Sequence, residues 1–297
     1  MTTLDAGELD AALAEAAVAD AVADEAAEAA GTKADAADGV CFNCGATRSG
    51  RFCADCGQKA LPLAPTLGYF VHELTHEVLN VDGKIFRSLR LLLTRPGFLT
   101  REIFLGRRAS YVSPIRLYLV VSVLSFALAA MFGGLDPVNF QYTADPGEAV
   151  DPLQVERVAD AERTLTQAVY VWLPRAMFVL VPLFAALVML FRRKTAFTYP
   201  QHLYFALHVH AAWFLGTAVD SLAEAIPLPR VAPAVDIATE LSMLAYVPIA
   251  FMRAYETTLW GAIWRTAIIV LLYFLALMVT LTAIALPTVW PIMFGQP

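Results

Sequence analysis

The chain has 297 residues, of which 58% are hydrophobic and 16% charged, with a mean hydropathy of +0.59. A composition this apolar excludes an ordinary soluble domain and indicates several membrane-spanning helices. The formal net charge of −6 is unevenly spread, because residues 1–38 hold ten acids and one lysine, whereas the rest of the chain holds seventeen acids and twenty bases.

Residues 1–38 form an acidic, alanine-rich leader without proline or aromatic residues. Alanine favours helix, but the segment has few large apolar side chains to bury, so we expect a frayed helix or disorder. It lacks the basic start and apolar run of a secretory signal, and it also lacks the Arg/Ser bias of an organelle address. We expect a solvated leader without specific partners.

All four cysteines lie within sixteen residues, as Cys41-Phe-Asn-Cys44-Gly and Cys53-Ala-Asp-Cys56-Gly. Two Cys-x2-Cys turns, each followed by glycine, are how a small loop presents four thiolates to a tetrahedral zinc ion. The alternative is a pair of disulfides in a secreted module, which the missing signal and the near-absence of a core disfavour. We therefore predict a two-stranded zinc ribbon over residues 39–60, with structural Zn²⁺ bound by Cys41, Cys44, Cys53 and Cys56.

A basic amphipathic segment follows the ribbon over residues 66–110. Apolar side chains at helical spacing predict helices over about residues 66–81, 84–94 and 98–105. Residues 84–116 hold eight bases and a single acid, Glu102. Basic amphipathic helices directly ahead of a span are typical of segments that lie in the headgroup plane, so we expect residues 84–116 to contact anionic lipid headgroups.

Residues 114–297 contain five hydrophobic segments, each of which we predict to be a transmembrane helix. Their approximate ranges are 114–135, 169–191, 201–222, 235–252 and 262–290. The last is long enough to tilt or to end in the interface.

Basic residues near the ends of these segments predict the orientation of the chain. Arg192-Arg193-Lys194 lies between the second and third segments, and Arg253 and Arg265 flank the loop between the fourth and fifth. The loop of residues 136–167 instead holds seven acids and two arginines. The sequence therefore predicts a cytoplasmic N-terminus and a C-terminus outside.

His72-Glu73-Leu-Thr-His76 matches the H-E-x-x-H pattern of zinc hydrolases, in which two histidines one turn apart hold zinc and the glutamate activates water. Both histidines project opposite the apolar stripe of the predicted helix, where a solvated polar face is the simpler interpretation. Glu102 is the only acid at a plausible distance downstream to serve as a third ligand. A zinc hydrolase is thus an alternative, and an enzyme is the less favoured class.

Three histidines, His202, His208 and His210, fall in the third hydrophobic segment. Polar groups inside a bilayer are costly and are by default functional, so a transporter or channel is another alternative. His202 and His210 roughly share a helical face, whereas His208 points elsewhere. The simpler interpretation is that these histidines hydrogen-bond between packed helices.

The chain resembles a family of uncharacterised bacterial membrane proteins, catalogued as a domain of unknown function, from about Cys41 to Trp213. The residues that carry the resemblance are Cys41, Cys44, Gly45, Phe52, Cys53, Cys56, Gly57, Gln58, Arg95-Pro96-Gly97, Gly106-Arg107-Arg108, Tyr111, Pro114, Pro182-Leu-Phe-Ala185, Arg192-Arg193, Tyr199, His202, Phe205, Ala206, His208 and His210. The resemblance implies a metal at the four cysteines and leaves the activity open.

These observations predict an all-α membrane protein, in which amphipathic interfacial helices and a small zinc ribbon precede about five transmembrane helices. We expect it in the bacterial inner membrane, with the lipid bilayer as its surroundings. The ribbon would be a structural module or would bind a protein partner, and no nucleic acid is expected.

Overall fold

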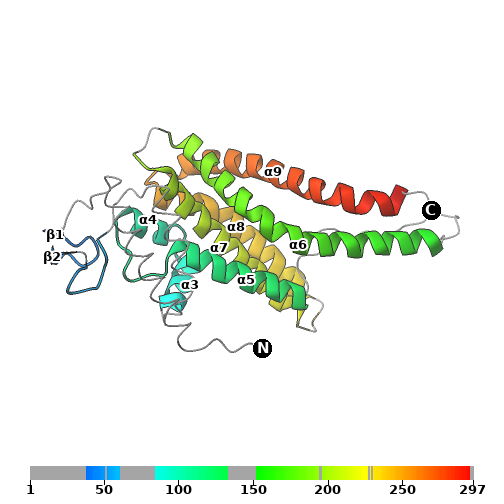
Figure 1. Cartoon of the computed structure of the whole chain (residues 1–297), viewed down its shortest axis with the longest axis horizontal. Helices are drawn as coiled ribbons and strands as arrows, with labels where there is room; N and C mark the ends of the chain where they lie inside the picture. The colour runs from blue at the N-terminus through cyan, green and yellow to red at the C-terminus, as the bar shows by residue number, and fades with distance from the viewer. Residues whose placement is uncertain are drawn as a thin grey trace, which may run out of the picture.

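A computed structural model describes residues 38–50, 52–60, 84–132, 152–193, 196–226, 228 and 230–294 (Figure 1). The leader before residue 38, the helix predicted over 66–81 and the His72-Glu73-Leu-Thr-His76 motif lie outside these residues. The described part is mostly helical, as predicted, with a small cysteine cluster at one end.

A two-stranded hairpin precedes seven helices in the described part of the chain. The elements are β1 (Asp38–Val40), β2 (Thr47–Ser49), α3 (Lys84–Thr94), α4 (Phe98–Phe104), α5 (Pro114–Phe132), α6 (Pro152–Phe191), α7 (Tyr199–Glu224), α8 (Val231–Ala254) and α9 (Leu259–Phe294).

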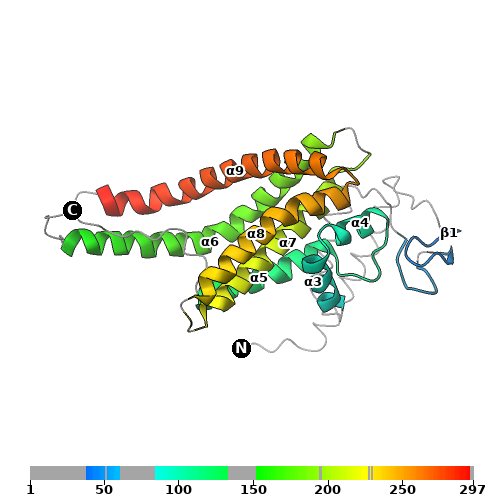
Figure 2. The ribbon, with the colours of Figure 1, turned by 180° about the vertical axis from the view of Figure 1, so that it is seen from behind.

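Helices α5 to α9 form a bundle in which successive helices run in opposite directions, with α7 at its centre. Helix α7 packs against α5, α6 and α8, and α9 packs on the outside against α6 and α8. The hairpin, α3 and α4 lie at the end of the bundle where α5, α7 and α9 begin (Figures 1 and 2).

In the described residues, α5, α6, α8 and α9 are the helices long and apolar enough to cross a membrane. The segment predicted as the third span is α7, which has 26 residues but is not among them. From His202 to Ala212 every α7 residue is buried, so neighbouring helices rather than its own apolar side chains shield its polar groups. Helix α9 shows the opposite pattern, with only 6% of its apolar window buried.

Helix α6 begins at Pro152, well before the predicted start at residue 169. Its first four turns contain acids, but Leu, Ala, Glu and Gln are good helix formers, so the polar half continues the helix. At about 1.5 Å per residue its 40 residues span roughly 60 Å. Helix α6 and its neighbour α9 therefore reach beyond α5, α7 and α8 at the end far from the hairpin (Figures 1 and 2).

Helix α4, which belongs to the segment predicted to lie in the headgroup plane, packs against α7 and α8. Its contact with lipid headgroups stays a prediction. Its residues Leu99, Thr100 and Ile103 are buried. Gly97, which precedes α4, has φ +76°, and a Cβ there would lie 2.8 Å from the Cα of Ala250 in α8. The turn between α3 and α4 therefore needs glycine both for its conformation and for its close approach to α8.

Helix α3 has one face against the protein and one exposed face. Ser88 and Leu92 face the protein, whereas Phe86 and Leu93 are 78% and 45% exposed. Phe86, Arg90 and Leu93 follow the four- and three-residue spacing of one helical face. That face presents apolar and basic side chains together to its surroundings.

Candidate metal centre and its contact with the bundle

The structure brings the four predicted ligands together. The Sγ atoms of Cys41, Cys44, Cys53 and Cys56 all lie within 4.8 Å of one another. The closest pairs, Cys41 with Cys56 and Cys44 with Cys53, are 3.6 and 3.5 Å apart. These distances are too long for a disulfide. They are close to the roughly 3.8 Å between sulfurs that a tetrahedral ion with Zn–S bonds of about 2.3 Å requires.

Two turns of the same geometry present these sulfurs. In the first, Gly45 N–H donates to Cys41 O (2.8 Å), and in the second, Gly57 N–H donates to Cys53 O (2.9 Å). Gly45 and Gly57 have φ of +79° and +70°, and a Cβ at either would meet nothing within 4 Å. The glycines are therefore needed for backbone conformation and not for space.

Each turn is closed by its own short ladder. Strands β1 and β2 pair antiparallel around the first turn, and Phe52 pairs with Lys59 around the second. Cys41 and Cys53, the first ligand of each pair, are 1% and 2% exposed. Two similar half-sites thus face one another across the sulfur cluster.

The two thiols of the first turn differ, because desolvation and the neighbouring cysteine sulfurs raise the pKa of Cys44 to about 12. A backbone N–H of Cys44 directed at the sulfur of Cys41 lowers the pKa of that thiol to about 7. The thiolate is the form that binds a metal ion. Four converging sulfurs with backbone N–H groups around them fit a structural zinc ion, since such closed sites use four protein ligands.

Gln58 joins this ribbon to the bundle. Its Nε2 donates to Gly106 O (2.8 Å), and its Oε1 accepts the N–H groups of Arg108 (3.0 Å) and Ala109 (3.1 Å). The side chain is only 6% exposed. Residues 106–109 form the loop between α4 and α5, so the second turn of the ribbon is held against the end of the bundle by three hydrogen bonds to one side chain.

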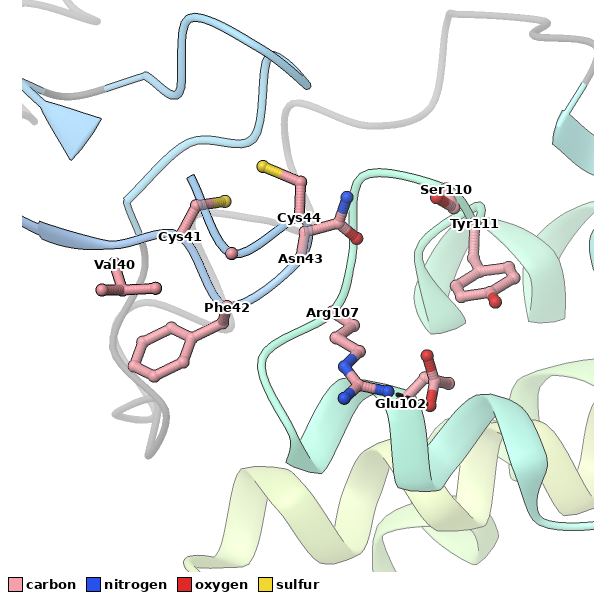
Figure 3. Close-up of a pocket in the computed structure, with 10 residues that line it drawn as sticks. Val40, Cys41, Phe42, Asn43, Cys44, Glu102, Arg107, Ser110 and Tyr111 are labelled. Carbon is pink, nitrogen blue, oxygen red and sulfur yellow. Dashed lines mark hydrogen bonds and ion pairs between the residues drawn. The ribbon is translucent and has the colours of Figure 1, made fainter. Parts of the chain in front are cut away.

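A polar pocket of about 600 Å³ separates the first turn from the same loop (Figure 3). Asn43 and Cys44 line it from the ribbon, and Arg107 and Tyr111 from the bundle side. Arg107 Nη1 lies 3.3 Å from Glu102 Oε1, at the floor of this pocket. Glu102, the acid considered as a third ligand for a hydrolase, is therefore engaged by a neighbouring arginine.

The three histidines of α7 each bond to another element. His202 Nδ1 lies 2.8 Å from Tyr255 Oη after α8, and His208 Nδ1 lies 2.8 Å from Thr100 Oγ1 of α4. His210 Nε2 lies 2.8 Å from Tyr273 Oη of α9. His208 thus faces α4, whereas His202 and His210 face α8 and α9. These contacts join α7 to three other elements, α4, the end of α8 and α9.

Arg175, the charged residue within the second predicted span, bonds locally. Its Nη1 donates to Val171 O, one turn earlier in α6, and its guanidinium lies 5.3 Å from the ring centroid of Trp172.

Sequence reasoning missed the docking role of Gln58 and the histidine partners Thr100, Tyr255 and Tyr273. Gln58 follows the second Cys-x2-Cys turn and His202 lies in the predicted third span, but their partners are about 50 residues or more away in the chain. No spacing rule connects residues so far apart.

Residues 82–126 match a family model described as "Protein of unknown function (DUF3667)". The matched range contains Arg95-Pro96-Gly97 and Gly106-Arg107-Arg108, two of the segments that carry the predicted resemblance to an uncharacterised family. The ribbon lies outside this range. No curated protein and no solved structure matches the chain.

Proposed function

We propose that the protein is a multi-pass protein of the bacterial inner membrane, with a cytoplasmic zinc ribbon fixed to the inner end of its helical bundle as a structural and docking module. The observation that carries this proposal is the set of three Gln58 hydrogen bonds to the loop of residues 106–109. A ribbon held in this way is presented in a fixed orientation.

The charge distribution supports a cytoplasmic ribbon. At the ribbon end, Arg192 Nη2 donates to Tyr255 O and Arg253 Nη1 donates to Pro96 O, so basic residues from several loops meet there. The opposite end of the bundle instead carries acidic residues, with Asp220 near the end of α7 and Asp236 near the start of α8. Basic residues accumulate on the cytoplasmic side of membrane proteins. The cytoplasm is also reducing, which keeps cysteines available for zinc.

In this arrangement α7 crosses the membrane together with α5, α6, α8 and α9, which makes five crossing helices. Its composition is too polar for α7 to be recognised as a span from hydropathy. Five crossings from a cytoplasmic ribbon leave the C-terminus outside. The apolar side chains that the ribbon exposes, Val40, Phe42 and Phe52, are 64%, 47% and 60% accessible and supply the contact surface for a protein partner.

Reporter fusions test this placement. A reporter active only in the cytoplasm should work when fused after Lys194 and fail after Asp151 or Pro297, because residues 192–194 are basic and the loop of residues 136–167 carries a net charge of −5. A reversed pattern at any of the three sites would refute the five-span arrangement.

Transport is a second candidate, favoured by one observation. The Nε2 atoms of His202 and His208 are buried and have no hydrogen-bond partner among the described residues. Buried, unsatisfied ring nitrogens in a central helix are costly, and ion or proton pathways are one reason to retain them. The bonded Nδ1 atoms of both rings favour the structural interpretation, and the hydrolase alternative rests on His72 and His76, which lie outside the described residues.

A further inference from the structure

We propose that the groove between the α3–α4 turn and the end of α8 binds the phosphate-bearing headgroup of an anionic phospholipid. This inference rests on the proposed membrane placement, which sets this end of the bundle at the inner headgroup level. It is independent of the metal at the four cysteines.

The groove has a volume of about 430 Å³ and combines basic and apolar side chains. It is lined by Arg95, Phe98, Arg101, Met252, Arg253 and Glu256. Three guanidinium groups against one carboxylate leave a formal charge of +2. Phe98 and Met252 are half-buried and form an apolar base beneath these charges.

The arginines keep donors available for a ligand. Arg253 uses Nη1 on Pro96 O (3.3 Å), and Arg95 lies with its guanidinium 5.7 Å from the ring centroid of Phe98. Arg101 directs Nε and Nη2 at one oxygen of Glu256, at 3.0 and 2.8 Å. Each guanidinium has five N–H donors in a planar fork, which is the geometry that recognises phosphate oxygens in pairs.

Glu256 acts as a weak internal substitute for the ligand. Its ion pair with Arg101 is exposed, with side chains 67% and 48% accessible, and exposed pairs contribute little stability. Glu256 also has φ +47°, a left-handed conformation that is uncommon for residues other than glycine. A phosphodiester headgroup, which presents two anionic oxygens to a guanidinium, can therefore replace this carboxylate on Arg101 at small cost.

The walls of the groove are fixed relative to one another. A Cβ at Gly97 would lie 2.9 Å from the carbonyl carbon of Ala250, so the turn that carries Arg95 and Phe98 rests directly on the α8 backbone. Arg253 Nη1, which bonds Pro96 O, joins the same two walls. A site between two rigid walls holds its charged groups in place before a ligand arrives.

The apolar surface of α8 leads from the membrane into the groove. Leu241 is 62% and Leu244 75% exposed, and the helical spacing of residues 241, 245, 248 and 252 continues this face to Met252. An acyl chain lying along this face would place its headgroup phosphate among the three arginines. Basic pockets between helices at the cytoplasmic side are typical sites for such headgroups.

Lipid binding to the full chain in detergent tests the proposal. We would titrate phosphatidylglycerol, cardiolipin and zwitterionic phosphatidylcholine and measure bound lipid by native mass spectrometry. Both anionic lipids should bind in preference to phosphatidylcholine. Arg95→Gln and Arg253→Gln should each weaken anionic-lipid binding about fivefold. Arg157→Gln, at the exposed far end of α6, is the matched control and should change nothing.

Glu256→Gln gives an effect of opposite sign. It removes the competing charge but keeps the side-chain shape, so anionic-lipid binding should tighten, by about two- to fivefold. A fall in stability alone cannot mimic this gain. Zinc content should stay the same in every variant, which separates this site from the ribbon.

Three outcomes would overturn the inference. Equal binding of phosphatidylcholine, or unchanged binding in both arginine variants and in Glu256→Gln, would show that the groove does not select anionic headgroups. Binding of inorganic phosphate alone, with the same arginine dependence and no gain from a lipid tail, would assign the groove to a free anion instead.

Discussion

The ribbon and the helical bundle are stabilised by different kinds of interaction. In the ribbon, Cys41 and Cys53 are buried, while the large apolar residues Val40, Phe42 and Phe52 face outward. In the bundle, the rings of Phe197, Phe205 and Phe251 pack around that of Tyr255 at centroid distances of 4.8–5.5 Å. The fold of the ribbon therefore depends on its four cysteines, whereas the fold of the bundle depends on side-chain packing.

The largest effect should follow from removing a thiolate. Cys53→Ser should abolish stoichiometric zinc and make residues 38–60 sensitive to protease, since a structural zinc ion contributes about 10–16 kcal/mol to the folding of a small module. Metal analysis and limited proteolysis measure these two quantities, and circular dichroism measures the helix content of the bundle.

Helix content should not change in this variant, because the bundle has its own apolar core. Asn43→Ser, which alters the first turn without removing a ligand, is the control and should keep its zinc. One zinc ion in the purified Cys53→Ser protein would refute the metal assignment, and two in the natural protein would reopen the histidine sites.

The four cysteines could be predicted from sequence because the ligands of one half-site are three residues apart, so local geometry alone brings them together. The helical bundle could be predicted for a similar reason, since hydropathy reports long apolar helices. The position of α4 could not be predicted, because its basic composition resembles that of an interfacial helix and its packing against α7 and α8 involves residues far away in the chain.

Helices α7 and α9 show why hydropathy alone is an incomplete guide. Helix α9 is the most apolar of the long helices and the least buried, whereas α7 is buried along most of its length and carries three histidines. High hydropathy is needed where a helix contacts lipid, whereas a helix surrounded by other helices can carry polar side chains. The start of α6 differs from the prediction for a related reason, because its polar residues from 152 onward predict a loop ahead of the span but continue the helix.

The second effect in size concerns packing in the bundle. Gly97→Ala adds a Cβ against the Ala250 backbone and forces alanine into a left-handed conformation, for a combined cost of about 2–5 kcal/mol. The Tm of the bundle should fall by several degrees while zinc content stays the same.

Gly216→Ala is the matched control, because its Cβ would meet the side chain of Thr239 instead of backbone and its φ is not positive. It should lower the Tm less than Gly97→Ala. An equal or larger fall in the control would show that the contact between the α3–α4 turn and α8 is not a tight one.

The third effect measures how strongly the two regions are coupled. Gln58→Ala removes three hydrogen bonds at a buried contact, which we expect to weaken docking by about 1–3 kcal/mol. Because docking stabilises the folded ribbon, the same variant should bind zinc about 5- to 150-fold more weakly.

Competition with a chelator measures that affinity. Lys59→Ala, one residue further on, is the control, because Lys59 pairs with Phe52 through its backbone. Unchanged zinc affinity in Gln58→Ala would mean that the ribbon folds independently of the bundle.

The smallest effect is expected at a histidine of α7. His210→Phe removes the contact with Tyr273 Oη, and such interhelical hydrogen bonds contribute about 0.6 kcal/mol on average in a membrane. The Tm should fall by a degree or two with no change in zinc content. Complete loss of a cellular phenotype at normal abundance would instead favour the transport alternative.

The central claim is that metal binding folds the ribbon and thereby holds it on the bundle, and hydrogen exchange at residues 107–109 tests it most directly. The amides of Arg108 and Ala109 donate to Gln58, whereas the amide of Arg107 donates to Glu102 O (2.8 Å) in the last turn of α4. With zinc bound, all three amides should be protected from exchange. After zinc removal, the account predicts fast exchange at Arg108 and Ala109 and continued protection at Arg107. Equal protection of all three with and without zinc would contradict it.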